Sequence, residues 1–165
     1  MLVAQMQPES DYKFSLDARA ALEKKVGEIE LPDALLKRWL SVTNENNTEK
    51  AINIDEEYAK MIPDLKWSLI KEEIVKDFEI KVEDADILEV AKTATRNQFS
   101  QYGMMNVPAD TLEKYASDML KDKKVASNMA DRAIEEKVMS VIKEHVTLNE
   151  KNVSIEDFYK MFEGK

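Results

Sequence analysis

Side chains that commonly carry out catalysis or bind transition metals are scarce in this sequence. It contains no cysteine, and His145 is its single histidine. These counts argue against zinc sites, iron–sulfur clusters, thiol chemistry and disulfides. A nucleophile activated by His145 would need a serine or threonine in an elbow-like sequence, and none is present. His145 falls near the C-terminal end of an expected helix, where a cation stabilises exposed carbonyl groups, so we interpret it as a structural residue.

Paired carboxylates offer the next possible chemistry, at Glu56-Glu57, Glu72-Glu73 and Glu135-Glu136. Carboxylates bind hard cations, but a di-iron helical bundle needs two Glu-x-x-His pairs, which one histidine cannot supply. We therefore interpret the pairs as solvated helix faces. The three glycines lie too far apart for a phosphate-binding loop. The sequence predicts no catalytic residue, no metal site and no cofactor.

Methionine is the residue type that stands out, with nine copies. Its flexible thioether side chain is common on adaptable binding surfaces, although most of these methionines are expected in the core. Met104 and Met105 differ because they lie between Gly103 and Pro108, where burial is less assured. An exposed apolar tip at Tyr102–Met105 would be a binding surface. The candidate residues for apolar contact with a bound substrate are Met61, Trp67, Phe99, Tyr102, Met104, Met105, Met119 and Met129.

The composition predicts an all-α fold. The 165 residues include only 3 glycines and 4 prolines, with 7% aromatic, 44% hydrophobic and 35% charged residues. Barrels, sandwiches and glycine-rich nucleotide folds need more turn and strand formers than this. A mean hydropathy of −0.49 means that many helical surfaces face water, which points to an extended shape.

The charge balance and the short apolar runs argue against nucleic acid and membranes as binding partners. Lys and Arg number 24 against 33 Asp and Glu, a net charge of −9, so direct binding to nucleic acid is not expected. A membrane-spanning helix needs about 18 consecutive apolar residues, and no apolar segment of this sequence is that long. The first residues lack the basic flank and apolar run of a signal peptide. We expect a soluble, cytoplasmic protein with no membrane contact.

The N-terminal third is predicted to contain a tail, two helices and a polar loop. Residues 1–11 lack periodicity and are interpreted as a linker or tail. Ser15 is expected to cap a helix over Leu16–Val26 that Gly27 ends, and Pro32 to open a second helix. A polar loop is expected at residues 44–48. The expected buried stripe of the second helix is Leu35, Leu36, Trp39 and Leu40.

The longest apolar periodicity runs from Asp55 to about Phe78 and contains Pro63. Because proline has no N–H to donate, this helix must kink or restart at Pro63. Its apolar residues form two stripes on different faces, which predicts two separate packing partners. The stripes are Tyr58, Met61, Ile62, Leu65 and Leu69, and Trp67, Ile70, Ile74 and Phe78.

Four further helices are expected. The first covers about Asp84–Tyr102 and ends at Gly103, and the second begins at Asp110 or Thr111 after a connection at residues 104–108. A long helix follows the basic turn at residues 121–124, with its buried seam at Val125, Met129, Ala133, Val138, Val141 and Ile142. A short final helix is capped by Ser154.

Five segments, in their order and spacing, resemble the C-terminal chaperone domain of bacterial trigger factor. They are Ile29–Trp39, with its L-P-x-x-L pattern, Leu65–Ile74, Ile80–Ile87, Glu136–Val138 and Val153–Phe158. The resemblance implies an elongated helical body with two protruding arms, similar to the SurA peptide-binding domain. It also implies binding of unfolded or nascent polypeptides through scattered apolar patches, without ATP.

The other trigger factor domains have no counterpart here. The sequence contains neither the Gly-Phe-Arg-Lys loop of the ribosome-binding domain nor the glycine- and aromatic-rich sheet of the FKBP-like prolyl isomerase domain. We therefore expect residues 12–165 to form a C-terminal chaperone domain taken from a longer chain, without enzymatic activity. Contact with the ribosome would come only through the missing domain. The alternative is a helical scaffold or self-association module, such as a homodimer, that binds no client.

Overall fold

The structure is a computed structural model that describes residues 2–45 and 53–162. Within these ranges it contains seven α-helices and no strand, which confirms the predicted all-α class. The helices are α1 (Leu2–Val26), α2 (Asp33–Glu45), α3 (Ile54–Asp77), α4 (Asp84–Gln101), α5 (Ala109–Met119), α6 (Lys123–His145) and α7 (Ile155–Lys160).

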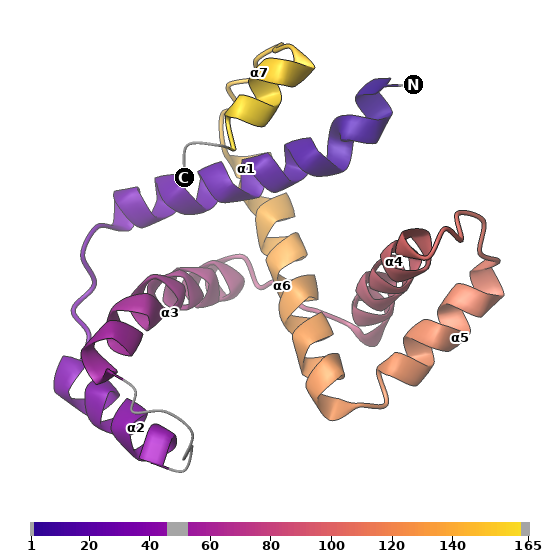
Figure 1. The fold of residues 1–165 in the computed structure, drawn as a ribbon. Helices are drawn as coiled ribbons and strands as arrows, with labels where there is room; N and C mark the ends of the chain where they lie inside the picture. Colours follow the sequence, from indigo (N-terminus) through magenta and orange to yellow (C-terminus); the bar gives the residue numbers. More distant parts are fainter. Residues whose placement is uncertain (1, 46–52, 163–165) are drawn as a thin grey trace.

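The helices form an open body with two arms (Figure 1). Helix α6 lies at the centre, α1 crosses near its C-terminal end, and both contact α3. One arm is the pair α2–α3, in which α2 packs mainly on α3, and the other is the pair α4–α5, joined to α6 through α4. This arrangement confirms the expected elongated body with protruding helical arms.

The largest buried cluster lies where α4, α5 and α6 meet. It contains Val90, Ala91, Ala116, Met129 and Ala133. Three of these five residues are alanines, whose small side chains let the helix backbones approach closely. The cluster holds the base of the α4–α5 arm on α6 and leaves its far end without a packing partner (Figure 1).

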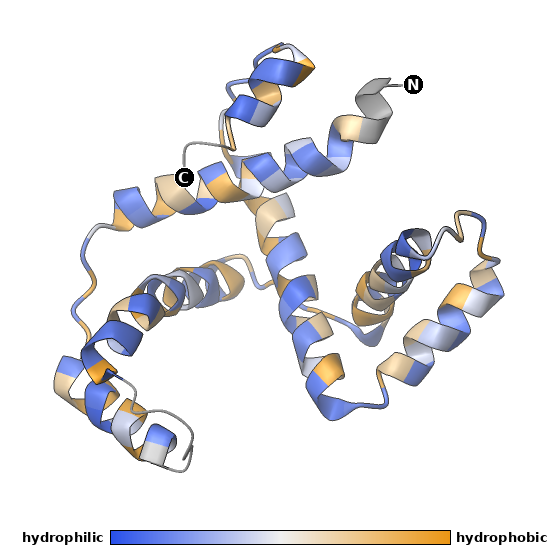
Figure 2. Cartoon of the chain, viewed as in Figure 1, coloured by the Kyte–Doolittle hydropathy of each residue, from blue (hydrophilic) through white to orange (hydrophobic). Residues whose placement is uncertain are grey.

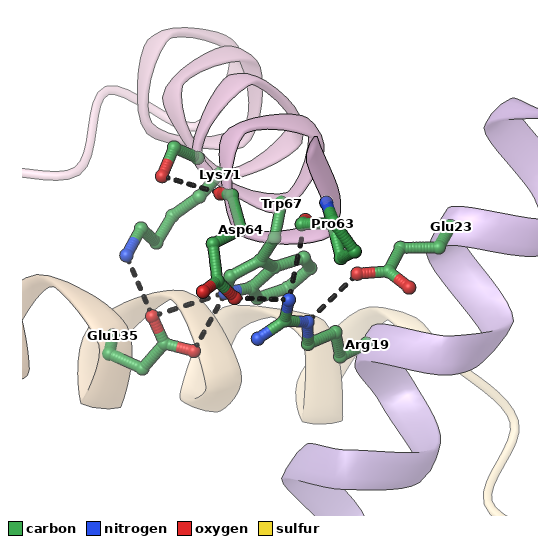
Figure 3. Close-up of polar contacts among 8 residues, drawn as sticks. Arg19, Glu23, Pro63, Asp64, Trp67, Lys71 and Glu135 are labelled. Carbon is green, nitrogen blue, oxygen red and sulfur yellow. Dashed lines mark hydrogen bonds and ion pairs between the residues drawn. The ribbon is translucent and has the colours of Figure 1, made fainter. Parts of the chain in front are cut away.

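A second junction, centred on Trp67 of α3, joins α1, α3 and α6 (Figure 3). The Trp67 side chain is only 4% exposed, and its Nε1 donates a hydrogen bond to Glu135 Oε1 of α6 at 3.1 Å. Lys71 Nζ donates to the other oxygen of Glu135 at 2.8 Å. From α1, the guanidinium carbon of Arg19 lies 5.6 Å from the centre of the Trp67 ring, a cation–π contact.

Helix α3 runs through Pro63 without a break, so the predicted restart at this residue does not occur. Proline removes the donor that would bond the carbonyl of Ala59, four residues earlier. Both residues are exposed, so water can reach that carbonyl. On the other side of the helix, Arg19 of α1 donates to the Pro63 carbonyl at 3.3 Å and pairs with Asp64 at 2.9 Å. These contacts from α1 support the continuous helix at Pro63.

The N-terminal prediction is wrong in its secondary structure. Residues 2–11, expected to be an irregular linker or tail, form the first turns of α1. The Ser15 hydroxyl donates to the Tyr12 carbonyl at 2.7 Å inside this helix and caps nothing. Tertiary contacts support the early turns, because Asp11 pairs with Lys143 of α6 at 2.9 Å and Tyr12 stacks on Phe162. The proposed domain boundary at residue 12 stays a prediction.

The other helix ends follow the sequence signals. Helices α1 and α4 end before Gly27 and Gly103, which adopt φ values of 75° and 80° that favour glycine. Helix α2 begins directly after Pro32, and Ser154 caps α7 by accepting from the Asp157 N–H at 3.2 Å. The predicted polar loop differs, because Asn44 and Glu45 belong to α2 and residues 46–48 lie outside the described residues.

The two tryptophans give a direct test of the Trp67 junction. We expect Trp67→Ala to lower the free energy of unfolding by about 3–5 kcal/mol, because it empties a buried site and leaves Glu135 without its donor. Trp39→Ala, at an exposed position, should change it by less than about 0.5 kcal/mol. Urea unfolding followed by circular dichroism measures both. Equal losses in the two variants would contradict the junction.

Candidate functional site

The free end of the α4–α5 arm carries an apolar surface, the tip patch, made of Phe99, Tyr102, Met104, Met105 and Tyr115. Tyr102 and Met105 are 74% and 76% exposed, among the highest values for large apolar residues in the described chain. Phe99 is half-buried and supports the patch by an edge-to-face contact with Tyr115, with 5.2 Å between ring centres. Hydrophobic residues in this connection are visible in Figure 2.

A local motif at the end of α4 fixes the tip patch. The Met104 N–H bonds to the Phe99 carbonyl at 3.0 Å, and the Gly103 N–H bonds to the Ser100 carbonyl at 2.9 Å. With Gly103 at positive φ, this is the Schellman ending of a helix, which satisfies the last carbonyls and turns the chain sharply. The motif therefore presents Tyr102, Met104 and Met105 at the outer end of the arm.

The tip also lacks charge. Residues 97–109 include no Asp, Glu, Lys or Arg, in a chain where 35% of residues are charged. An apolar segment bound on residues 97–109 would therefore cover no charged side chain of that stretch, and desolvating an ion is the costliest step in burying a polar surface. The tip is thus suited to apolar contact.

A second exposed apolar surface, the α2 face, consists of Leu35, Trp39 and Val42. Their spacing of i, i+4 and i+7 places them on one side of α2, where they are 65%, 56% and 55% exposed. The prediction that Leu35 and Trp39 are buried is therefore wrong. Leu36 and Leu40 of the same predicted stripe are half-buried.

Polar contacts hold α2 on α3 and so orient the α2 face outward. Lys37 Nζ pairs with Asp55 at 2.7 Å and lies 5.1 Å from the centre of the Tyr58 ring. The Tyr58 hydroxyl donates to the Asp33 carboxylate. This hydrogen bond favours the neutral phenol and raises the pKa of Tyr58 to about 12. With Asp33 and Lys37 engaged by α3, the exposed apolar residues are left on the solvent side of α2.

The eight residues predicted for substrate contact do not form one site. Phe99, Tyr102, Met104 and Met105 come together at the tip. Met119 is half-buried against the core cluster and Met61 is half-buried on α3. The remaining two, Trp67 and Met129, are interior residues of the two junctions, so their apolar surface is already covered.

Sequence reasoning missed Leu35, Trp39, Val42 and Tyr115 as surface residues. Each belongs to an apolar stripe at helical spacing, which looks the same whether the chain covers it or leaves it open. Glu135 was also misjudged as part of a solvated pair, because Trp67 and Lys71 both donate to it. The sequence does not show which part of an apolar stripe a neighbouring helix covers. Nor does it show that Glu135 has a hydrogen-bond partner 68 residues away.

The described residues show little else that could do chemistry. No group of three or more His, Cys, Asp or Glu side chains is placed to hold a metal ion there. No helix in the described part of the chain has the length and apolarity needed to cross a membrane. His145 is the last residue of α6, as predicted, and its ring contacts Phe78 with 4.7 Å between centres. An open cavity of about 330 Å³ lies between α1 and residues 151–158.

These features define the protein as an open all-α domain with two arms, each bearing an exposed apolar surface. Comparison with known families agrees with this class. Residues 10–162, nearly the whole chain, match the family described as probable trigger factor, C-terminal domain, and the chain belongs to that family. No curated protein and no solved structure gives a significant match.

The Tyr58–Asp33 contact predicts a pH dependence. Because the folded pKa of Tyr58, about 12, exceeds the ordinary 10.0, the contact stabilises the α2–α3 arm fully below pH about 10 and is lost as the pH rises through about 12. Tyrosinate absorbance, compared with Tyr58→Phe, should show this late titration. Asp33→Asn should return the pKa of Tyr58 toward 10. Asp55→Asn, which removes only the ion pair with Lys37, should leave this pKa high. A Tyr58 pKa near 10 in the unaltered chain would contradict the contact.

Proposed function

We propose that this domain holds unfolded or nascent polypeptides by apolar contact, without nucleotide and without catalysis. The observation that carries the proposal is the pair of exposed apolar surfaces, the tip patch and the α2 face, on separate arms of a trigger factor C-terminal domain. Contiguous exposed apolar patches on a water-soluble surface are typical of binding sites for other polypeptides. In this proposal the domain acts in the cytoplasm. Contact with the ribosome would be made by another domain of trigger factor.

The energetics of the two surfaces favour weak, broad binding. Full burial of a large apolar side chain contributes about 1.5–3 kcal/mol, and a client segment would cover each patch only in part. Association itself costs at least about 4 kcal/mol, so one patch alone gives low affinity. A flexible client that contacts both patches binds with higher overall affinity, because its second contact forms within the complex that is already bound. Neither patch contains a charged side chain that would demand one particular client sequence.

The surroundings of the patches keep the domain dispersed. The chain is 35% charged with a net charge of −9, and like-charged molecules repel each other at low ionic strength. The same apolar surfaces would serve the alternative function, self-association, if a second copy covered them. Charge repulsion between copies favours an uncharged or cationic client over a second copy.

Matched double variants test this function. Tyr102→Ser/Met105→Ser removes the tip contacts and Leu35→Ser/Trp39→Ser removes the α2-face contacts. Val146→Ser/Met161→Ser alters two exposed apolar residues outside both patches. We expect each patch variant to bind a permanently unfolded, fluorescently labelled protein at least about tenfold more weakly, a loss of about 1.4 kcal/mol. The control pair should bind normally, and titrations followed by fluorescence anisotropy would measure all three.

Aggregation of a refolding client gives the functional readout. The unaltered domain at equimolar ratio, with no nucleotide, should suppress light scattering, and the combined four-residue variant should not. Unchanged scattering with the unaltered domain would refute client holding. A concentration-independent dimer in sedimentation, lost in the same patch variants and accompanied by no client binding, would establish the self-association alternative instead.

A further inference from the structure

The exposed methionines of this chain are concentrated at the tip. Of the methionine side chains that the structure describes, Met104, Met105 and Met161 are exposed, at 55%, 76% and 42%. The others are half-buried or buried, namely Met6, Met61, Met119, Met129 and Met139. Two adjacent thioethers, including the most exposed one, therefore lie in a surface whose proposed role depends on being apolar.

Exposure controls the reaction of a methionine thioether with a peroxide. A sulfur lone pair attacks one peroxide oxygen, the O–O bond breaks, and the remaining oxygen leaves as water or an alcohol after taking up a proton. The sulfur is oxidised to a sulfoxide and the peroxide is reduced. At Met105 the Ser100 hydroxyl contacts Sδ at 3.2 Å, and the same donor can bond to the stronger acceptor, a sulfoxide oxygen.

From this placement we propose that Met104 and Met105 form an oxidative modification site that switches off the tip patch in the presence of peroxides. The inference rests on the proposed function, because it regulates the same apolar surface. A sulfoxide is polar and strongly hydrated, so covering it with an apolar client carries a desolvation cost that the thioether does not. Residues 97–109 contain no charge, so two sulfoxides would add two strongly hydrated groups to the apolar part of this stretch.

The other arm provides an internal contrast. Helix α2 contains no methionine, and its face consists of Leu35, Trp39 and Val42. Mild oxidation should therefore disable one arm and spare the other. The oxidised domain should lose client binding only in part, and less than the Tyr102→Ser/Met105→Ser variant, because Tyr102 stays unaltered.

The test combines peptide mapping with client titration. After brief treatment with hydrogen peroxide, mass spectrometry should find sulfoxide at Met105 and Met104 well before Met119 or Met129. Affinity for a labelled unfolded protein should fall at least threefold, and methionine sulfoxide reductase should restore it. Met104→Leu/Met105→Leu should keep its own starting affinity after treatment, whatever that affinity is, whereas Met161→Leu should stay sensitive.

The outcomes separate this inference from the proposed function. Client binding that survives sulfoxide formation at Met104 and Met105 would overturn the switch and leave the holding function intact. Equal oxidation of exposed and buried methionines would overturn the site selectivity. Failure of the untreated chain to bind any unfolded protein would overturn both proposals, and it would be recorded before any peroxide is added.

Discussion

The Trp67 indole is the contact on which the shape of this domain depends. It brings together three helices that are distant in sequence, accepting the Arg19 cation on its face and donating to Glu135 at its edge (Figure 3). An indole suits this place because it offers a large apolar surface and one N–H donor. Burial of the ring and the pairing of Glu135 with Lys71 hold α1, α3 and α6 together at the base of the α2–α3 arm.

An open frame of this kind leaves apolar surface uncovered for a geometrical reason. A helix in a compact bundle has neighbours on several sides, whereas an arm helix packs mainly on one partner. Helix α2 has α3, and the outer side of its apolar stripe, at Leu35 and Trp39, faces water. The α4–α5 arm buries its base in an alanine-rich cluster and exposes its end. The exposed apolar surfaces are thus a consequence of the extended fold.

The two surfaces differ in chemistry. The α2 face uses a stiff aromatic ring and branched aliphatic residues, while the tip uses Met104 and Met105 on a Schellman turn. Methionine adapts to irregular partners because it is unbranched and polarisable. The same thioether is the oxidisable group, so adaptability and sensitivity to peroxides come from one side-chain property. In the proposed function, a domain with both kinds of surface would keep part of its client binding after oxidation.

Local structure follows from the amino-acid sequence alone, including the all-α class, most helix ends and the connection between Gly103 and Pro108. Glycine, proline and capping residues act within a few residues, so their effects can be read from the chain. Which apolar stripes are covered depends on the packing of the whole domain, which buries Trp67 in a junction and leaves Trp39 exposed to water. The tertiary structure also ordered residues 2–11 as helix and carried α3 through Pro63. The reason is that burial depends on packing between helices far apart in sequence, and spacing along one helix carries no information about its neighbours.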